Sequence, residues 1–262
     1  MSVPKALTIA GSDSGGGAGI QADLKTFSAF RVFGMSVLTA VTAQNSVGVQ
    51  GVLDLSPELV ALQLDSVLSD LGADAIKTGM LATGPVVAAV ADRLRAHGQT
   101  AVVVDPVMSA TSGDVLLAAD ARGALVKELL PLALVVTPNL DEAAALADMP
   151  VTTEAEMEEA ARRIHALGPR SVLVKGGHLP DSATDVLWDG KTLARFRASR
   201  LAGAATHGTG CTLSAAIAAG LARGTPLGDA VREAKAYVTA ALREGFTPGR
   251  GARVARHFVE RW

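Results

Sequence analysis

Short runs of apolar, mostly β-branched residues alternate along the chain with longer segments in which apolar positions recur every three or four residues. The short runs predict strands, because a strand buried on both faces of a parallel sheet is almost continuously apolar. The predicted strands are Ala6–Ala10, Ser36–Val41, Ala75–Thr78, Ala101–Asp105, Leu134–Thr137 and Ser171–Lys175.

The longer segments predict amphipathic helices, since residues such as Leu213, Ile217 and Leu221 fall on one helix face. These helices are expected near residues 20–30, 57–71, 83–96, 120–130, 154–167, 211–223 and 227–243. Alternating strands and helices indicate an α/β fold with a mostly parallel sheet covered by helices on both faces.

Two further runs, Asp185–Trp188 and Leu193–Arg197, flank Asp189-Gly190, which is a hairpin signal. We expect them to form antiparallel strands at one edge of the sheet. No internal repeat, low-complexity block or Pro/Ser-rich linker interrupts the sequence. We therefore expect one domain spanning residues 1–262.

Composition narrows the class of protein. Apolar residues make up 49% of the 262 positions and charged residues 19%, which excludes intrinsic disorder. The 24 basic and 26 acidic residues give a net charge of −2, so there is no electrostatic basis for binding nucleic acid. The single cysteine, Cys211, cannot form an internal disulfide, and a reducing cytoplasm is the expected location.

No membrane association is expected. The stretches 32–53 and 201–222 lack Asp, Glu, Lys and Arg, and each is about as long as the 20 residues of a spanning helix. Both contain several polar residues, among them Gln44 and His207, so we interpret them as buried segments beside a polar site. The N-terminus has no basic region followed by an apolar one, and a secretory signal is not expected.

Polar residues follow nearly every predicted strand. Ligands of open α/β sheets bind beyond the carboxyl ends of the strands, so these positions are the candidate site. They are Gly11-Ser12-Asp13, Gln44-Asn45, Gly79-Met80, Asp105, Thr137-Pro138-Asn139 and Lys175-Gly176-Gly177-His178.

A first glycine cluster, residues 11–19, joins the first strand to a helix. Its glycines would let the backbone approach a ligand, and a helix N-terminus favours anions. The cluster matches neither the dinucleotide-binding nor the P-loop spacing, and a simple tight turn is the alternative. Asp13 and Asp23 favour the functional interpretation, because two carboxylates could bind hydroxyl or amine groups.

A second glycine cluster, residues 206–212, also precedes a helix. Gly208, Gly210 and nearby amides could bind an anion. Cys211 lies in the first helical turn, where the helix dipole lowers the pKa of a thiol, although a lone cysteine is more often a small buried hydrophobe. A dyad of Cys211 with His207 is disfavoured, because sequence neighbours rarely have the required geometry.

Candidate cation and phosphate ligands follow three other strands. Asp105 and the pair Asn139 and Glu142 could bind Mg²⁺, although Glu142 could instead stabilise a helix N-terminus. Lys175 ends a strand, and an anionic ligand would explain a lysine there, with a solvated loop as the alternative. No zinc or calcium motif is present.

Together these segments resemble the ribokinase-like kinases and, within them, the hydroxymethylpyrimidine/phosphomethylpyrimidine kinases of thiamine biosynthesis. The resemblance runs from end to end and is most specific in the last segment, where cysteine stands in place of the aspartate of most ribokinase-like enzymes. The segments are AGSDSGGGAGIQADLKTF (10–27), TAQNSVGVQ (42–50), QLDSVLSDL (63–71), KTGML (77–81), VVDPVM (103–108), TPNLDEAAAL (137–146), VLVKGGH (172–178) and THGTGCTLSAAIAAGLA (206–222).

The resemblance implies a three-layer α/β/α sandwich, ATP, Mg²⁺ and a homodimer. It implies that an aminopyrimidine is bound by Gly11, Asp23, Gln44, Met80 and Val107. The nucleotide would contact Thr137, Asn139, Lys175 and Thr209, and the metal Asp105 and Glu142. Phosphoryl transfer would use Lys175, the amides of Gly208 and Gly210, and Cys211, which would either accept the substrate's proton or position its hydroxyl.

Three departures from the resemblance stand out. Related enzymes often have lysine within the stretch occupied here by residues 109–113, Thr42 replaces a residue that is commonly apolar, and the tail at 249–252 is less rich in histidine. The nearest rival activity is a pyridoxal or pyridoxine kinase. A non-catalytic binding protein is disfavoured by the presence of Lys175, Glu142 and Cys211 together, and a dinucleotide-dependent oxidoreductase by the glycine spacing.

Overall fold

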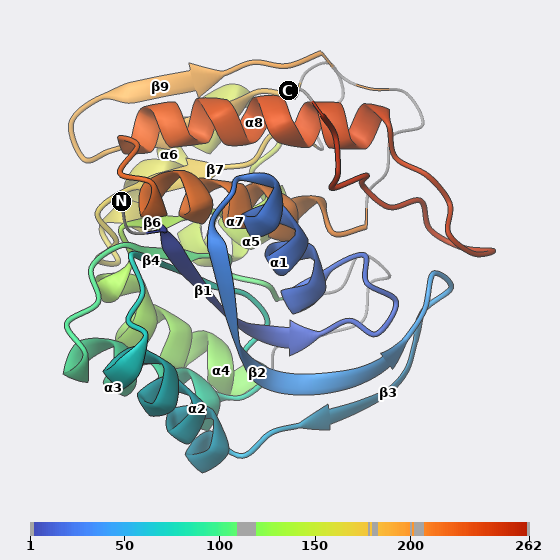
Figure 1. Cartoon of the computed structure of the whole chain (residues 1–262). Helices are drawn as coiled ribbons and strands as arrows, with labels where there is room; N and C mark the ends of the chain where they lie inside the picture. The colour runs from blue at the N-terminus through green and yellow to red at the C-terminus, as the bar shows by residue number, and fades with distance from the viewer. Residues whose placement is uncertain are drawn as a thin grey trace.

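A single twisted sheet forms the centre of the protein, which we describe from a computed structural model covering residues 3–108, 119–177, 179, 183–199, 201 and 207–260. Within these residues nine strands lie in the order β3-β2-β1-β4-β5-β6-β7-β8-β9 (Figure 1). The strands are β1 (Lys5–Ser12), β2 (Phe33–Gln44), β3 (Val49–Asp54), β4 (Ala75–Thr78), β5 (Val102–Val104), β6 (Val135–Val136), β7 (Val172–Val174), β8 (Asp185–Trp188) and β9 (Leu193–Phe196).

The central strands are parallel, as the alternating pattern predicted. β2, β1, β4, β5, β6 and β7 pair in parallel, whereas β3, β8 and β9 are antiparallel to their neighbours. The hairpin predicted at Asp189-Gly190 is confirmed, and it places β9 at one edge. β3 was not predicted; it forms the opposite edge.

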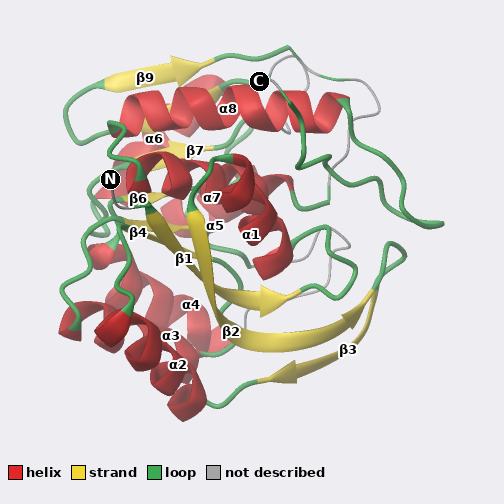
Figure 2. Ribbon diagram, in the orientation of Figure 1, coloured by secondary structure: helices red, strands yellow, loops and turns green. Residues whose placement is uncertain are grey.

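Helices cover both faces of the sheet (Figure 2). They are α1 (Gly19–Ala29), α2 (Pro57–Asp70), α3 (Gly84–Ala96), α4 (Ala119–Ala124), α5 (Leu140–Ala147), α6 (Glu154–His165), α7 (Thr209–Ala222) and α8 (Leu227–Arg243). Residues of α2, α3, α5 and α6 share one apolar core, and residues of α1, α7 and α8 share the other. The three-layer α/β/α sandwich is therefore confirmed.

Alternation along the strands divides the two cores. Val102 and Val104 of β5 face the α2–α3 side, and Val103 between them faces α7 and α8. All three are fully buried. This burial on both faces explains why the sequence of these strands is uninterruptedly apolar.

Helix ends follow local sequence signals. Ser56 and Thr83 accept hydrogen bonds from the third residue of α2 and of α3, and each helix has proline in its first turn. The helix predicted at 120–130 instead ends in a π-helical turn over Leu125–Leu129. The helix predicted from 211 begins earlier, at Thr209. Among the described residues no helix is long and apolar enough to cross a membrane.

Candidate active site

The predicted site residues gather where the parallel strands end. Gly11, Gln44 and Met80 lie at or just beyond the ends of β1, β2 and β4, and Asp105 and Lys175 directly follow β5 and β7. Thr137 and Asn139 follow β6. The order of the strands thus brings to one edge of the sheet residues as far apart in sequence as Gly11 and Lys175, which are 164 positions apart.

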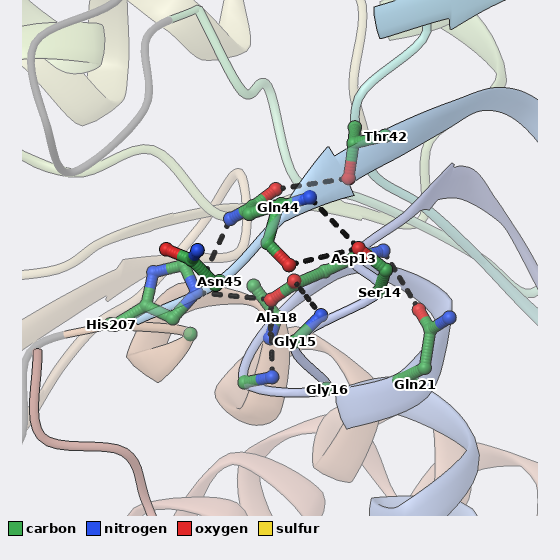
Figure 3. A network of polar contacts seen from close by, with 12 residues as sticks. Asp13, Ser14, Gly15, Gly16, Ala18, Gln21, Thr42, Gln44, Asn45 and His207 are labelled. Atoms are coloured by element: carbon green, nitrogen blue, oxygen red, sulfur yellow. Dashed lines mark hydrogen bonds and ion pairs between the residues drawn. The ribbon is translucent and has the colours of Figure 1, made fainter. Parts of the chain in front are cut away.

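Asp13 organises the first glycine loop. Its carboxylate accepts hydrogen bonds from the backbone N–H groups of Gly15 (2.8 Å), Gly17 (3.1 Å) and Ala18 (2.8 Å), and it lies 3.0 Å from Nε2 of His207 (Figure 3). Burial alone would raise the pKa of Asp13, but these hydrogen bonds hold it below its ordinary value. The loop is therefore built around an ionised carboxylate, whose oxygens are already satisfied by the protein.

The second glycine cluster packs against the first. Gly208 has a φ of 78° and caps α7, and a Cβ at this position would lie 1.8 Å from the carbonyl oxygen of Gly17. His207 bonds to Asp13, so the structure pairs it across the two loops. Thr206, from the same sequence cluster, lies outside the described residues.

Asp23 forms a buried ion pair that the sequence did not reveal. Its Oδ2 accepts hydrogen bonds from Lys77 (2.8 Å) and Thr8 (2.6 Å), and both charged side chains are fully buried. Burial raises the pKa of Asp23, and the charge of Lys77 opposes that rise. Oδ1 is also buried and has no hydrogen-bond partner among the described residues. The contact of Asp23 with substrate stays a prediction.

Met80 and Val107 are half-buried, and Met80 lies beside Gly11 of the first loop. A Cβ at Gly11 would lie 2.5 Å from Cε of Met80, so only glycine fits there without moving the methionine. The Val107 N–H donates to the carbonyl oxygen of Asp105 (2.9 Å). These two apolar side chains could pack on a flat ring, which stays a prediction.

A charged group occupies the ends of β5, β6 and β7. Lys175 donates to Oδ1 of Asp105 (2.9 Å), and Thr137 lies 3.4 Å from the same oxygen. Gly210 packs against this pair, since a Cβ there would lie 3.1 Å from Nζ of Lys175. The start of α7, where anion binding is predicted, therefore directly adjoins the lysine expected to contact phosphate.

Glu142 begins helix α5 with Asn139. The Asn139 side chain accepts from the Glu142 N–H (2.9 Å), and Glu142 Oε2 accepts from the Asn139 N–H (2.8 Å), which is a capping box. Burial raises the pKa of Glu142 to about 7; the charge of Lys175 opposes that rise and the charge of Asp105 adds to it. Glu142 therefore does stabilise the N-terminus of α5, as considered above. It also lies close enough to Lys175 and Asp105 for their charges to influence its pKa.

The expectation of a Cys211 thiolate is wrong for this structure. Burial raises the pKa of the thiol to about 11, and the nearby charge of Lys77 only partly offsets this effect. The helix N-terminus is present, but desolvation of the sulfur outweighs it. The raised pKa favours a neutral thiol at pH 7 for Cys211, which is half-buried in the first turn of α7.

A cavity of about 620 Å³ lies between α8 and the chain after β9 and was not found from the sequence. Its lining includes Arg197, Lys235 and Arg243. Lys235 donates to Asp185 (2.7 Å), and Asp185 accepts from the Gly176 N–H (3.0 Å). These two bonds connect the cavity to the segment that carries Lys175. Residues 109–113, the stretch in which a lysine was expected from the resemblance, lie outside the described residues.

Two solved structures similar to this chain are a pyridoxal kinase and a phosphomethylpyrimidine kinase. The ADP complex of Bacillus subtilis pyridoxal kinase has a TM-score of 0.90 and 41% identity, with 98% of each chain covered. A phosphomethylpyrimidine kinase of Clostridium difficile 630 has a TM-score of 0.82 and 41% identity, covering 91% of this chain and 98% of that one. The chain thus has the fold of the ribokinase-like kinases.

Sequence comparison gives the particular family. The family described as phosphomethylpyrimidine kinase matches residues 13–256. A hydroxymethylpyrimidine/phosphomethylpyrimidine kinase of Rhizobium meliloti (strain 1021) is 57% identical over 261 residues, which is 98% of each chain. The chain belongs to the phosphomethylpyrimidine kinase family, as its motifs predicted.

Proposed function

We propose that the protein transfers the γ-phosphoryl group of ATP to the hydroxymethyl group of 4-amino-5-hydroxymethyl-2-methylpyrimidine, and a second one to the resulting monophosphate. One observation carries the proposal: the Lys175–Asp105 pair lies against Gly210 at the start of α7, at the sheet edge that also presents Gln44. Membership of the phosphomethylpyrimidine kinase family supports both substrates.

Recognition of the pyrimidine falls to residues at the ends of β1, β2 and β4. The Gln44 amide has both a donor and an acceptor, which match the amino group and the adjacent ring nitrogen of the substrate. Gly11 leaves room for the ring, and Met80 and Val107 supply apolar contact. Oδ1 of Asp23 is a further acceptor, buried and without a partner among the described residues.

The charged group suits Mg²⁺. Among the described residues no three His, Cys, Asp or Glu side chains form a metal cage. Mg²⁺ commonly takes one or two carboxylates together with phosphate oxygens and water. Asp105 and Glu142 are two buried carboxylates that share the single charge of Lys175, so a cation beside them would relieve their repulsion. These two residues would hold the ion, which supplies positive charge to the phosphates.

Phosphoryl transfer then depends on positioning and charge neutralisation more than on covalent chemistry. Lys175 offsets charge on the transferring group, and the N–H groups at Gly208, Thr209 and Gly210 stabilise it from the start of α7. Thr137 and Asn139 follow β6, and Thr137 lies 3.4 Å from the carboxylate of Asp105. The neutral thiol of Cys211 positions the attacking hydroxyl, because a thiol with a raised pKa is a poor base at pH 7.

The nucleoside part of ATP fits the cavity beside α8. The basic lining of the cavity, and the hydrogen bonds of Asp185 with Lys235 and with the Gly176 N–H, support this assignment. The ADP complex of the pyridoxal kinase supports nucleotide use in this fold. Ala236→Trp, which fills the cavity, should raise KM for ATP and leave KM for the pyrimidine unchanged.

A second candidate activity is phosphorylation of pyridoxal, favoured by the 41% identity to the Bacillus subtilis pyridoxal kinase over 98% of both chains. Release of ADP, measured with each substrate in parallel, tests both activities. We expect a higher kcat/KM for the aminopyrimidine. A higher value for pyridoxal would replace the main proposal by the second one.

The unit that acts is proposed to be a homodimer in a reducing cytoplasm. The edge strand β3 and its neighbour β2 expose apolar residues, with Val41 at 42%, Val52 at 52% and Leu53 at 67%. An exposed apolar sheet edge is a typical site of association with another chain, and a second copy of this chain would cover it. Light scattering during gel filtration should give twice the chain mass, and Leu53→Glu should lower it. Cell fractionation tests the location.

A further inference from the structure

The side-chain amide of Gln44 lies between two polar neighbours (Figure 3). One end, Oε1, is 3.2 Å from Oγ1 of Thr42, and the other end, Nε2, is 3.5 Å from Nε2 of His207. An amide exchanges its donor and acceptor ends by a half-turn about its last torsion. The neighbours therefore decide which end presents the acceptor.

Thr42 has one proton and two lone pairs to share between two groups. Its Oγ1 lies 2.8 Å from the carbonyl oxygen of Ser12, which can only accept, so the proton goes there. A lone pair then faces Gln44. The partner that suits a lone pair is the NH₂ end of the amide.

His207 imposes the same requirement from the other side. Its Nε2 is 3.0 Å from a carboxylate oxygen of Asp13, and an ionised carboxylate can only accept. The pKa of Asp13 is held low by this hydrogen bond and by those from Ala18 and Gly15, against the effect of burial, so the carboxylate is ionised. Nε2 of His207 therefore carries the proton. That proton is donated to Asp13, so Nε2 has no lone pair to accept from the NH₂ end of the Gln44 amide. The carbonyl end is the one that does not place a second donor against His207.

Both neighbours thus favour one orientation, with the NH₂ group of Gln44 toward Thr42 and its carbonyl toward His207. We propose that Thr42 is a specificity-determining positioning residue, whose hydroxyl fixes the donor and acceptor ends of the Gln44 amide. The proposal rests on the assignment of Gln44 to the substrate ring in the proposed function. Thr42 is 8% exposed, so water competes little for these bonds.

A fixed amide distinguishes two rings of the same shape. The 4-amino ring donates from its amino group and accepts at N3. The 4-oxo analogue, 5-hydroxymethyl-2-methylpyrimidin-4-one, accepts at its oxygen and donates from N3–H. Binding the analogue in the same pose requires the amide to turn over. Without the Thr42 hydroxyl, one of the two constraints against turning is lost.

The test compares the ratio of kcat/KM for the amino substrate to that for the 4-oxo analogue. Thr42→Val removes the hydroxyl at nearly constant shape, and we expect it to lower the ratio roughly three- to tenfold, the effect of about one hydrogen bond. Thr42→Ser keeps the hydroxyl and should stay within about twofold of the wild-type ratio, as no bond is lost. An unchanged ratio in Thr42→Val, with the same Tm, would overturn the proposal.

A double-mutant cycle shows whether Thr42 acts through Gln44. In the Gln44→Leu background Thr42→Val should have no further effect on the ratio, and an equal effect in both backgrounds would overturn the proposal. Calorimetric Kd values for the two rings give the same discrimination without turnover. Failure of the proposed function would appear separately, as bound pyrimidine that is not phosphorylated by the wild-type enzyme.

Discussion

Glu142 has two tasks at the residue scale, because it caps α5 and also lies beside the Lys175–Asp105 pair. Its pKa of about 7 means that it is half-protonated near neutrality, so activity that needs the carboxylate should rise as pH increases through about 7. Raising Mg²⁺ should move this rise to lower pH, because the cation favours the ionised form.

Glu142→Gln separates the two tasks. Glutamine can still complete a capping box, so we expect little change in Tm. Loss of the charge should lower kcat/KM roughly 10- to 100-fold, the usual effect of removing a group that supports a metal, and should abolish the rise near pH 7. Unchanged activity with a lower Tm would show that Glu142 serves only the helix.

For Cys211, in contrast to Glu142, we expect substitution to have only a small effect on activity. A thiol with a pKa raised to about 11 should be alkylated by iodoacetamide at a rate that still increases above pH 9. Cys211→Ser should keep kcat within about tenfold of wild type, well short of the 10²–10⁴-fold loss expected on removing a general base. An alkylation rate that levels off below pH 8 would show that Cys211 is a thiolate near neutral pH, contrary to this account.

At the element scale, the segment after α8 holds the site together. The Ala252 N–H donates to the carbonyl oxygen of Ser46 (2.6 Å), two residues beyond Gln44, and Val254 forms a bridge with His207. His257 lies 3.0 Å from Thr212 in the first turn of α7. The tail therefore connects the end of β2 to the N-terminal end of α7.

Gly251→Ala should loosen this connection. A Cβ at Gly251 would lie 1.9 Å from the backbone oxygen of Ser46, and neither backbone can yield easily. We expect a loss of about 1–3 kcal/mol in the free energy of unfolding, as for other overpacked positions, and a higher KM for the pyrimidine than for wild type. Gly249→Ala is the matched control, since its Cβ would meet only the Ser46 hydroxyl, at 2.5 Å. Equal effects of both changes, measured by urea unfolding and kinetics, would contradict this account of the tail.

Elements with a strong period were predictable from the sequence, and α8 begins and ends at the predicted residues. β3 was missed because its apolar residues do not alternate with polar ones and most of the strand is exposed. α5 was missed because its eight residues are too few for a clear period, although the Asn139/Glu142 capping box was a usable signal.

The site was predictable where residues follow strands, and less so where distant charges interact. Lys77 and Asp23 form an ion pair although they are 54 positions apart in sequence, and no local sequence pattern predicts such a pair. The pKa of Cys211 was predicted from the helix dipole, which is local, but is governed by burial, which depends on the whole fold. The cavity beside α8 likewise needed the packing of β9 against that helix.

At the scale of the whole molecule, we propose that the chain unfolds as one domain whose stability falls in acid. Burial lowers the pKa of His257 to about 4 from its ordinary 6.5. Between these values the unfolded chain binds more protons, so stability is retained above pH 6.5 and is lost as pH falls toward 4. Each tenfold change in proton affinity is worth about 1.4 kcal/mol, which makes this loss on the order of 3–4 kcal/mol.

His257→Gln should remove that part of the acid loss. Urea unfolding of both proteins at pH 7 and pH 5, followed by fluorescence and circular dichroism, measures it. We expect the pH 7 to pH 5 difference to shrink in the variant, with coincident transitions for the two probes. An unchanged difference would mean that other groups set the acid limit, and separate transitions would contradict a single domain.

The most direct measurement is mass spectrometry of the products formed from 4-amino-5-hydroxymethyl-2-methylpyrimidine, Mg-ATP and the purified protein. We predict a species one phosphate heavier than the substrate, followed by one two phosphates heavier, with both absent for Lys175→Met. A single phosphate throughout would limit the protein to the first step. Unchanged substrate, from protein that binds ATP and is folded, would contradict the assignment of this site as a pyrimidine kinase.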